Sequence, residues 1–422
     1  MSPELRCDVV VIGAGTAGLV AGARLAEAGA SVCVLAKGIG CTHLAPGTID
    51  VAGYTPELTD SPLEGVAALI AARADHPYGL IGPETMADAI SWLQHAAENG
   101  PFSGYRYVGD LEHNTLLPTA LGALRPSALL PSTMAAGDAG NLRQVCVIGT
   151  PQLRDVHPGL CAANLAAAGI EARGLNVELQ LDRADASTLG IARLFDDEHW
   201  RAQFCASVSP LLHAEEHVGL PAILGIRDPQ AVVDDLQQRF GRAVFEIPGL
   251  PPSVPGMRLY EILRHALRQA GGRLVLGAEV VGHKHAGDRI SSVVTRAAGH
   301  DRDYCAEWFV LAAGGFASGA IELDSRWIMH ERVLGLPLTG VPAPGEPRFV
   351  PGYSDEQPIS RVGVAIDAKL RALGCANVVV AGAGLPGAVP WREGSGEGLA
   401  LGSAVRAAQL ISGDRRPRLV KS

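Results

Sequence analysis

The chemistry of this chain begins with a glycine pattern near its start. The pattern G-x-G-x-x-G stands between an apolar, β-branched run (residues 8–12) and a segment with helical spacing (residues 16–28). The first glycine permits a tight turn, the second lets a phosphate approach the backbone, and the third lets helix and strand pack closely. Backbone N–H groups and the helix dipole favour an anion there. The predicted nucleotide contacts are the residues of this turn: Gly13, Ala14, Gly15, Thr16, Ala17 and Gly18.

The acid that usually follows such a turn is missing. About 20 residues on, a carboxylate would bind the ribose hydroxyls of an adenosine, but the second predicted strand (residues 31–35) runs into Ala36-Lys37-Gly38. Lys37 can offer a cation to a phosphate, or it can be a solvated residue at a strand end, and the sequence favours neither. Ala36, Lys37 and Gly38 are therefore candidate cofactor contacts.

Two later segments also pair an apolar run with glycines. WFVLAAGG (308–315) follows a helix and several predicted short strands, and NVVVAGAGLPG (377–387) precedes GSGEG (394–398) and a helix. This order resembles flavoproteins with a glutathione-reductase-like nucleotide domain. The resemblance implies further cofactor contacts in both segments: Ala313, Gly314, Gly315, Gly382, Gly384, Gly396 and Gly398.

The segment VLAKGIGCTHLAPGTIDV (34–51) looks like the fumarate reductase and L-aspartate oxidase branch of these flavoproteins, where a small residue and a lysine replace the acid. In that branch the following loop wraps the flavin, which makes Thr42, His43 and Gly47 candidate flavin neighbours. His43 is not spaced like the covalent flavin histidine of succinate dehydrogenases. We therefore expect non-covalent binding.

A closer resemblance covers nearly the whole chain, which is similar to the B-subunit family of anaerobic glycerol-3-phosphate dehydrogenase. The segments that carry it, in shared order, include THLAPGTIDV, HPYGLI (76–81), LGALRPSALLP, ARLFDDEHW (192–200), LPPSVPGMRLYEILRHALRQAGG and VLAAGGFASG (310–319). The resemblance implies a phosphorylated small-molecule substrate and two partners, a larger catalytic flavoprotein and an iron–sulfur, membrane-anchoring subunit. It implies FMN as the cofactor, whereas the glycine fingerprint favours FAD, and the sequence leaves both open.

Residues near the last glycine loop depart from that family. The family's G-F-D-P and G-C-G-G-G runs are replaced by Gly387-Ala388-Val389-Pro390 and by residues 394–398. Arg392 and Glu393 beside them can bind a substrate phosphate or tune the flavin, although surface ion pairing is the commoner fate. With His43 they are the weak catalytic candidates, and no catalytic base is identified. An electron-relay role, a stand-alone dehydrogenase or reductase, and a scaffold with a degenerate flavin site all stay open.

Composition excludes several other classes. The 422 residues carry a net charge of −9, which argues against a nucleic-acid partner. The eight cysteines form no C-x-x-C pair, so no zinc or iron–sulfur site is predicted. His213 and His217 stand one helical turn apart, which favours a solvated helix face over a metal site.

With no signal peptide or membrane span predicted, we expect a cytoplasmic protein. The family resemblance implies that its complex holds it peripherally on the inner membrane face.

The predicted fold is α/β. A Rossmann-like FAD/NAD(P)-binding domain, with a central parallel sheet and a β-meander, begins at residues 1–60 and returns at residues 251–422. The region between, residues 61–250, is predicted to be helical at first and then to form an inserted α/β domain. In this insert QVCVIG (144–149) and PAILGI (221–226) are predicted strands.

Overall fold

The chain packs as two compact units. The computed structural model describes residues 5–179, 181, 187–297 and 300–414. The first unit comprises Met1–Cys41, Val66–Ile90 and Leu263–Ser422, and the second comprises Thr42–Gly65 and Ser91–Ile262. The chain thus leaves its first unit and returns to it, as the glycine segments suggested, while the domain limits at residues 60 and 250 stay a prediction. The helices α2 (Pro62–Ala72), α4 (Pro83–Glu98) and α9 (Val254–Gln269) each have residues in both ranges.

The first unit is built on a five-stranded sheet in the order β12-β3-β2-β16-β21. Every neighbouring pair of strands in it is parallel. The strands are β2 (Val9–Ile12), β3 (Val32–Ala36), β12 (Arg273–Leu276), β16 (Trp308–Leu311) and β21 (Val378–Val380). Every residue of β2, β3, β16 and β21 is buried, which explains why these strands appear in the sequence as continuous apolar runs.

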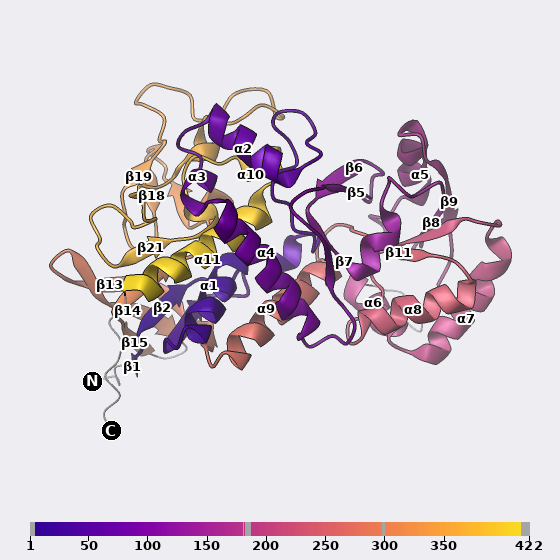
Figure 1. The fold of residues 1–422 in the computed structure, drawn as a ribbon, viewed down its shortest axis with the longest axis horizontal. Helices are drawn as coiled ribbons and strands as arrows, with labels where there is room; N and C mark the ends of the chain where they lie inside the picture. The colour runs from indigo at the N-terminus through magenta and orange to yellow at the C-terminus, as the bar shows by residue number, and fades with distance from the viewer. Residues whose placement is uncertain (1–4, 180, 182–186, 298–299, 415–422) are drawn as a thin grey trace. The chain divides into compact units, whose positions relative to one another are not determined.

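Helix α1 (Thr16–Glu27) lies beside helix α11 (Gly396–Asp414) within the first unit (Figure 1). Small residues let α1 come close to the sheet. A Cβ at Gly22 would lie 2.8 Å from Cγ2 of Val34 on β3, so only glycine fits there. The predicted helix and its two flanking strands are therefore confirmed as one βαβ unit.

A second sheet of the first unit contains the predicted meander. Its order is β1-β15-β14-β13, in which the last three strands are antiparallel neighbours. These strands are β1 (Leu5–Arg6), β13 (Glu279–Ala286), β14 (Arg289–Ala297) and β15 (His300–Cys305). The unit's remaining elements are short: α3 (Tyr78–Ile81), β17 (Ile321–Leu323), β18 (Met329–Glu331), β19 (Leu338–Thr339), β20 (Gly363–Val364) and α10 (Pro390–Glu393).

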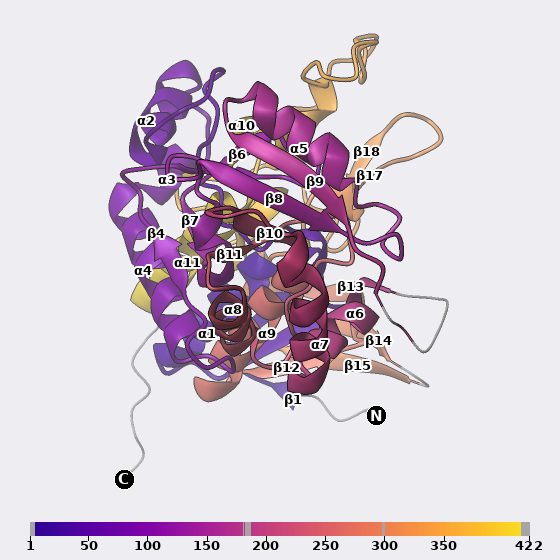
Figure 2. The same ribbon diagram turned by 90° about the vertical axis from the view of Figure 1, so that its right-hand side faces the viewer.

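The second unit contains a parallel sheet of its own, in the order β11-β10-β8-β9. Helix α5 (Pro158–Ala167) lies beside β8 and β9 (Figure 2). The other strands and helices of the unit are β4 (Tyr107–Gly109), β5 (Thr115–Pro118), β6 (Leu124–Ser127), β7 (Leu129–Pro131), β8 (Gln144–Gly149), β9 (Glu171–Asn176), α6 (Thr188–Phe195), α7 (Glu198–Val208), β10 (His217–Pro221), α8 (Pro229–Phe240) and β11 (Val244–Ile247). The predicted α/β class of the inserted region is thereby confirmed.

Two local predictions in this unit are wrong. Strand β10 ends at Pro221, so PAILGI is not a strand; its later residues form bends in which Gly225 has a φ of 81°. His213 and His217 do not share a helix, because the chain makes a turn between them, with Glu215 at a φ of 65°, and His217 begins β10. The four-residue spacing of the two histidines, which suggested a helix, therefore spans a turn and ends at the first residue of a strand.

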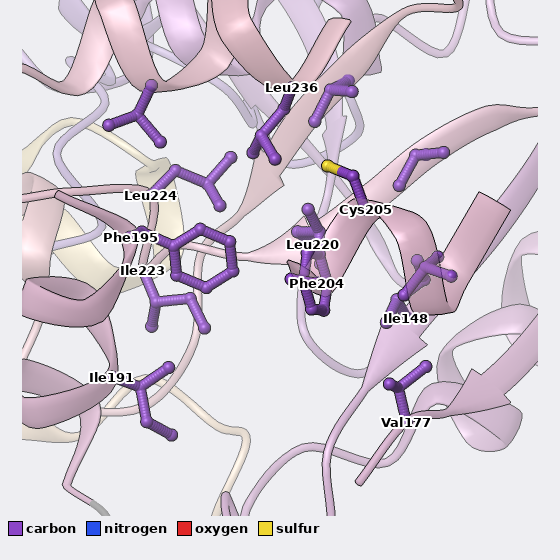
Figure 3. Packing of buried hydrophobic residues seen from close by; sticks show 14 of the residues in the cluster. Ile148, Val177, Ile191, Phe195, Phe204, Cys205, Leu220, Ile223, Leu224 and Leu236 are labelled. Carbon is purple, nitrogen blue, oxygen red and sulfur yellow. The ribbon is translucent and has the colours of Figure 1, made fainter. Parts of the chain in front are cut away.

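The core of the second unit is apolar and lies against its sheet. Phe195 of α6 and Phe204 of α7 meet edge to face, with ring centroids 5.3 Å apart. Ile223 and Leu224 come from the bends after β10 and join the same cluster (Figure 3). These buried bends explain the apolar run that resembled a strand, because an apolar stretch can be buried in irregular structure as well as in a sheet.

Candidate functional site

Three glycine-containing loops of the first unit follow three neighbouring strands. The loop after β2 contains Gly13, the loop after β16 contains Gly314, and the loop after β21 contains Gly382. Because β2, β16 and β21 are parallel and adjacent, their carboxyl ends lie at one edge of the sheet. In open α/β sheets ligands bind at this edge, at the point where successive connections run to opposite sides of the first strand.

The first loop has the geometry that a phosphate cradle needs. Gly13 has a φ of 113°, and a Cβ there would lie 2.2 Å from the carbonyl oxygen of Ala312. A Cβ at Gly18 would lie 2.0 Å from the carbonyl oxygen of Gly13, so helix and turn are in close contact. At Gly15 an added Cβ would meet nothing within 4 Å. The backbone is thus packed on one side of the turn and open at Gly15.

The three loops also contact one another. A Cβ at Gly315 would lie 2.2 Å from the carbonyl oxygen of Ala383, and one at Gly384 would lie 3.2 Å from that of Gly314. A Cβ at Gly382 would lie 2.9 Å from the Cβ of Ala17 on α1. The structure therefore brings together the cofactor contacts predicted at residues 13–18, 313–315, 382 and 384.

The residues after β3 lie beside the same turn. Ala36 is buried at the end of the strand, and Gly38 has open space where a Cβ would be. Gly40 passes over the turn, since a Cβ there would lie 2.7 Å from the Cα of Gly15. The Lys37 side chain is 78% exposed, and its Nζ lies 3.1 Å from Oε1 of Glu279. Lys37 thus has a solvated carboxylate partner, and its contact with a cofactor phosphate stays a prediction.

Glu393 is buried just before the last glycine segment. Its carboxylate pairs with the Arg73 guanidinium and accepts a hydrogen bond from His76 Nε2 at 3.2 Å. It also accepts from the backbone N–H of Val389 at 2.9 Å and from the Ser395 hydroxyl at 2.8 Å. The expectation of a surface ion pair is therefore wrong for Glu393, whose residue is only 4% exposed.

These donors decide the charge of Glu393. Burial alone would raise the pKa of the carboxyl, but hydrogen bonds from His76, the Val389 N–H and Arg73 outweigh burial and lower it from 4.5 to about 2. The Tyr78 N–H donates to His76 Nδ1 at 3.2 Å, so the imidazole proton lies on Nε2 and points at Glu393. Glu393 is therefore an ionised, fully hydrogen-bonded anchor and not a base near neutral pH.

This anchor joins the segment after α2 to the last glycine segment. Gly394, directly after Glu393, has a φ of 59°, and Ser395 is fully buried. Gly396 begins α11 and Gly398 lies buried in its first turn. The side chain of Arg392, by contrast, is exposed. The two charged neighbours thus differ: Glu393 fixes the loop and Arg392 faces solvent.

A cavity of about 1080 Å³ lies next to this anchor in the first unit. His76 lines it, together with Gly387 from the loop after β21 and Arg361. Four acidic residues also line it: Asp75, Glu346, Glu356 and Asp367. Arg361 is paired with Glu356, so the wall is predominantly acidic and poorly suited to a phosphate dianion.

The other predicted flavin neighbours belong to the second unit. Thr42 is buried, and a Cβ at Gly47 would lie 2.5 Å from the Cβ of Pro255 at the start of α9. The Tyr107 hydroxyl donates to the Gly47 carbonyl at 2.7 Å. His43 Nδ1 is buried and has no hydrogen-bond partner among the described residues. The loop with the predicted contacts is thus packed against the N-terminal turn of α9.

Helix α9 also contributes a buried ion pair to the second unit. The Arg258 guanidinium donates to Glu246 of β11 at 2.6 and 3.0 Å and to the carbonyls of Leu224 and Gly225 at 3.0 and 2.7 Å. The Thr133 hydroxyl donates to the same carboxylate at 2.7 Å. Both charged side chains are at most 1% exposed. This network holds α9 to the sheet of the second unit.

The carboxyl edge of the second unit's sheet is filled. The chain adds β9 on one side of β8 and later β10 on its other side. The point between β8 and β10 is therefore where a nucleotide would bind in such a sheet. Leu220, Phe195 and Phe204 occupy this place, and the remaining cavity is only about 10 Å³. That space holds one water molecule at most, so among the described residues that line it there is no room for a nucleotide.

The first unit's edge fits the phosphate part of a flavin nucleotide. Helix α1 follows the N-cap residue Gly15 with no side-chain cap and no acid in its first turn, and the space beside Gly15 is open. An anion there would meet backbone N–H groups and the positive end of the helix. Residues 13–18 would hold the phosphates, and the loops after β16 and β21 would lie along the rest of the cofactor.

Comparison with known proteins agrees with this geometry. The family of FAD-binding domains matches residues 8–388. The B subunit of anaerobic glycerol-3-phosphate dehydrogenase from Yersinia enterocolitica is 31% identical over 96% of this chain and 98% of its own length. The corresponding subunit of Yersinia pestis is 32% identical with the same coverage of both chains. A probable B subunit of the same enzyme from Halobacterium salinarum is 30% identical over 96% of this chain and 97% of its own.

The chain belongs to the family of FAD-binding domains and, with these relatives, to the B-subunit family of anaerobic glycerol-3-phosphate dehydrogenase. Of the two flavins left open by the sequence, the family supports FAD, bound without a covalent link. The chain is therefore a flavin oxidoreductase, and the predicted Rossmann-like FAD-binding fold is confirmed.

Solved structures resemble the chain only distantly. A 3-ketosteroid Δ1-dehydrogenase from Sterolibacterium denitrificans has a TM-score of 0.35 at 19% identity, over 74% of this chain and 48% of its own. A flavocytochrome c3 fumarate reductase has a TM-score of 0.35 at 14% identity, over 74% and 34%. Neither likeness is close enough to bear on the function.

The described residues contain neither a metal cluster nor a membrane-spanning helix. No three or more His, Cys, Asp or Glu side chains in this part of the chain are placed to hold a metal ion. None of its helices is long and apolar enough to cross a bilayer.

Sequence reasoning missed the partners of Glu393. Arg73 and His76 lie more than 300 residues before it, and His76 was noted only as part of HPYGLI. The only available signal was that shared motif, which gave no indication of what His76 contacts.

Proposed function

We propose that this chain is the flavin-binding subunit of an anaerobic, quinone-linked glycerol-3-phosphate dehydrogenase. It takes part in the oxidation of sn-glycerol 3-phosphate to dihydroxyacetone phosphate and in electron transfer to an iron–sulfur subunit and menaquinone. The observation that supports this most is 31% identity with a relative of that name over 96% of the chain. Residues 13–18 and 313–315 hold the cofactor in this proposal, together with Gly382, Gly384, Gly396 and Gly398.

The bound flavin supplies a hydride or electron acceptor. This chain's own residues would bind and orient it: the backbone N–H groups of residues 15–18 would hold its phosphates, and Glu393 keeps the last glycine segment in place. Because the Glu393 carboxylate already accepts from four donors, it does not remove a proton from a substrate hydroxyl. This favours an electron-relay role over the hydride step.

The relay role requires partners. We propose a larger flavoprotein that binds the phosphorylated substrate and an iron–sulfur subunit that anchors the complex at the inner face of the cell membrane. The acidic lining of the first unit's cavity supports a substrate site elsewhere, since a phosphate dianion is repelled by carboxylates. The chain itself is then cytoplasmic.

Purification with and without the larger subunit tests this proposal. The visible spectrum after reconstitution should show a bound flavin, and the mass of the released cofactor should be that of FAD. Glycerol-3-phosphate oxidation with an artificial acceptor should require the larger subunit. Turnover by the chain alone would favour a stand-alone dehydrogenase, and failure to bind any flavin would favour a scaffold role.

A further inference from the structure

An exposed aromatic cluster lies on the surface of the first unit. The hairpin of β17 and β18 turns through residues 324–328, and its Trp327 and Ile328 are 55% and 51% exposed. Phe349, which is 46% exposed, meets Trp327 edge to face with ring centroids 6.4 Å apart. With the neighbouring Arg326 and Arg348, these residues are here called the aromatic tip.

The aromatic tip is held rigidly. Asp324 accepts from the backbone N–H groups of Arg326 and Ile328 at 2.8 and 2.9 Å, and the Trp327 N–H donates to the Asp324 carbonyl at 3.0 Å. Arg348 Nε donates to the Trp327 carbonyl at 3.1 Å, which ties the Phe349 segment to the turn. A rigid exposed side chain loses little conformational entropy on binding, so the tip is organised for an interface.

The tip carries a strained residue, Trp327. Trp327 has a φ of 62°, a left-handed conformation that is uncommon for a bulky residue. Such strain persists where the surrounding structure enforces it, and it concentrates at functional positions. The base of the hairpin is different, because Ile321 and Met329 are buried in a small core with Ile359 and Val362. The fold thus stabilises the hairpin through its base and leaves Trp327 and Ile328 at the surface.

Two arginines, Arg326 and Arg348, are the sequence neighbours of the aromatic residues Trp327 and Phe349. Arg348 donates to the backbone carbonyls of Trp327 and Glu346, and among the described residues neither Arg348 nor Arg326 pairs with a carboxylate. Exposed aromatic residues next to arginines are the composition of binding hot spots. We propose that the aromatic tip docks into an apolar cleft, rimmed by carboxylates, on a partner protein. We identify this partner as the larger flavoprotein subunit, an identification that rests on the proposed function.

Other occupants fit less well. In a two-fold dimer of this chain the same surface meets itself, so each copy would bring the same projecting tip and neither would supply a cleft. An anionic lipid surface would meet the acidic residues near the turn, Glu322 and Glu346, on a chain with a net charge of −9. A partner cleft with a defined shape avoids both difficulties, since its carboxylates can face the two arginines alone.

Affinity measurements with the larger subunit test the proposal. Trp327→Asn suits the left-handed backbone and removes the ring, and Phe349→Ala removes its neighbour. Each should weaken binding of the full-length, FAD-loaded chain about thirtyfold or more, as loss of a hot spot does. Arg326→Gln should mainly slow association at low salt. The control is Leu121→Asn, because Leu121 is a 56% exposed apolar residue of the second unit; it should leave binding unchanged.

The outcomes separate the two proposals. FAD content and thermal unfolding must match the wild type in every variant compared. If the wild-type chain does not bind the larger subunit, the proposed function fails and this inference fails with it. If the wild type binds and Trp327→Asn binds equally well, only the docking inference is overturned. It is also overturned if Trp327→Asn abolishes binding to phosphatidylglycerol vesicles or dimerisation of the chain while assembly with the larger subunit persists.

Discussion

Replacing Gly15 by alanine separates cofactor binding from folding. Gly15 has a φ of −78° and a ψ of −174°, which any residue can adopt, and an added Cβ would meet no atom within 4 Å. The substitution at this helix N-cap should therefore cost at most about 1 kcal/mol of folding free energy. The methyl group would, however, occupy the space through which a phosphate oxygen reaches the backbone N–H groups.

The expected loss of affinity follows from those hydrogen bonds. A hydrogen bond to a charged group contributes about 1.5–3 kcal/mol, so losing one lowers the FAD affinity about 10- to 150-fold. Titration of the apoprotein with FAD, followed by quenching of flavin fluorescence, measures this. Gly249→Ala is the matched control, because that exposed glycine also has no atom within 4 Å of an added Cβ.

Gly18→Ala provides the opposite case. Its Cβ would lie 2.0 Å from the Gly13 carbonyl oxygen, so the backbone must move, and overpacking of this kind costs about 1–3 kcal/mol or more. Urea unfolding should therefore rank Gly18→Ala well below Gly15→Ala in stability. An unchanged FAD affinity in Gly15→Ala would refute the phosphate cradle, and equal stabilities of the two variants would refute the steric argument.

Three further substitutions test the charged residues. Glu393→Gln should lower the free energy of unfolding by about 3 kcal/mol, because Arg73 loses its counter-charge. The folded-state pKa of Glu393, about 2, lies below 4.5, so the wild type should lose this stability as pH falls from 4.5 toward 2 in urea unfolding, and the variant should not. Arg258→Met should cost about 3–5 kcal/mol by leaving Glu246 buried and unpaired, and the double variant with Glu246→Leu should lose less. Lys37→Ala should change stability by less than about 1 kcal/mol and leave FAD affinity unchanged, since this lysine is solvated; a tenfold weaker affinity would place its ammonium on the phosphate.

The elements around the glycine turn were predictable because their signals are local. Strand β2 is buried on both faces, so it appears as VVVI, and α1 follows the turn without a break. QVCVIG was predicted with the limits that β8 has in the structure. In each case the side-chain pattern and the backbone conformation are set by the same few residues.

The failures have a common physical cause. PAILGI is apolar because its Ile223 and Leu224 pack in the core of the second unit, and it is not a strand there: the carbonyls of Leu224 and Gly225 accept hydrogen bonds from the Arg258 guanidinium. Glu393 is buried because Arg73 and His76, more than 300 residues away, supply its hydrogen bonds. Neither contact leaves a trace in local spacing, since the partner of a buried charge is chosen by the tertiary fold.

The buried charges of the two units support one interpretation of what the protein does. In the first unit the Glu393 carboxylate holds a glycine segment at the cofactor edge, and in the second unit the Glu246 carboxylate holds helix α9. Each already accepts several hydrogen bonds, so a proton transfer to either would first have to break them. A hydride step needs a base with an available lone pair, whereas electron transfer needs only a rigidly positioned flavin. These two carboxylates are therefore structural, and the substrate's base is to be sought at His43 or in the partner subunit.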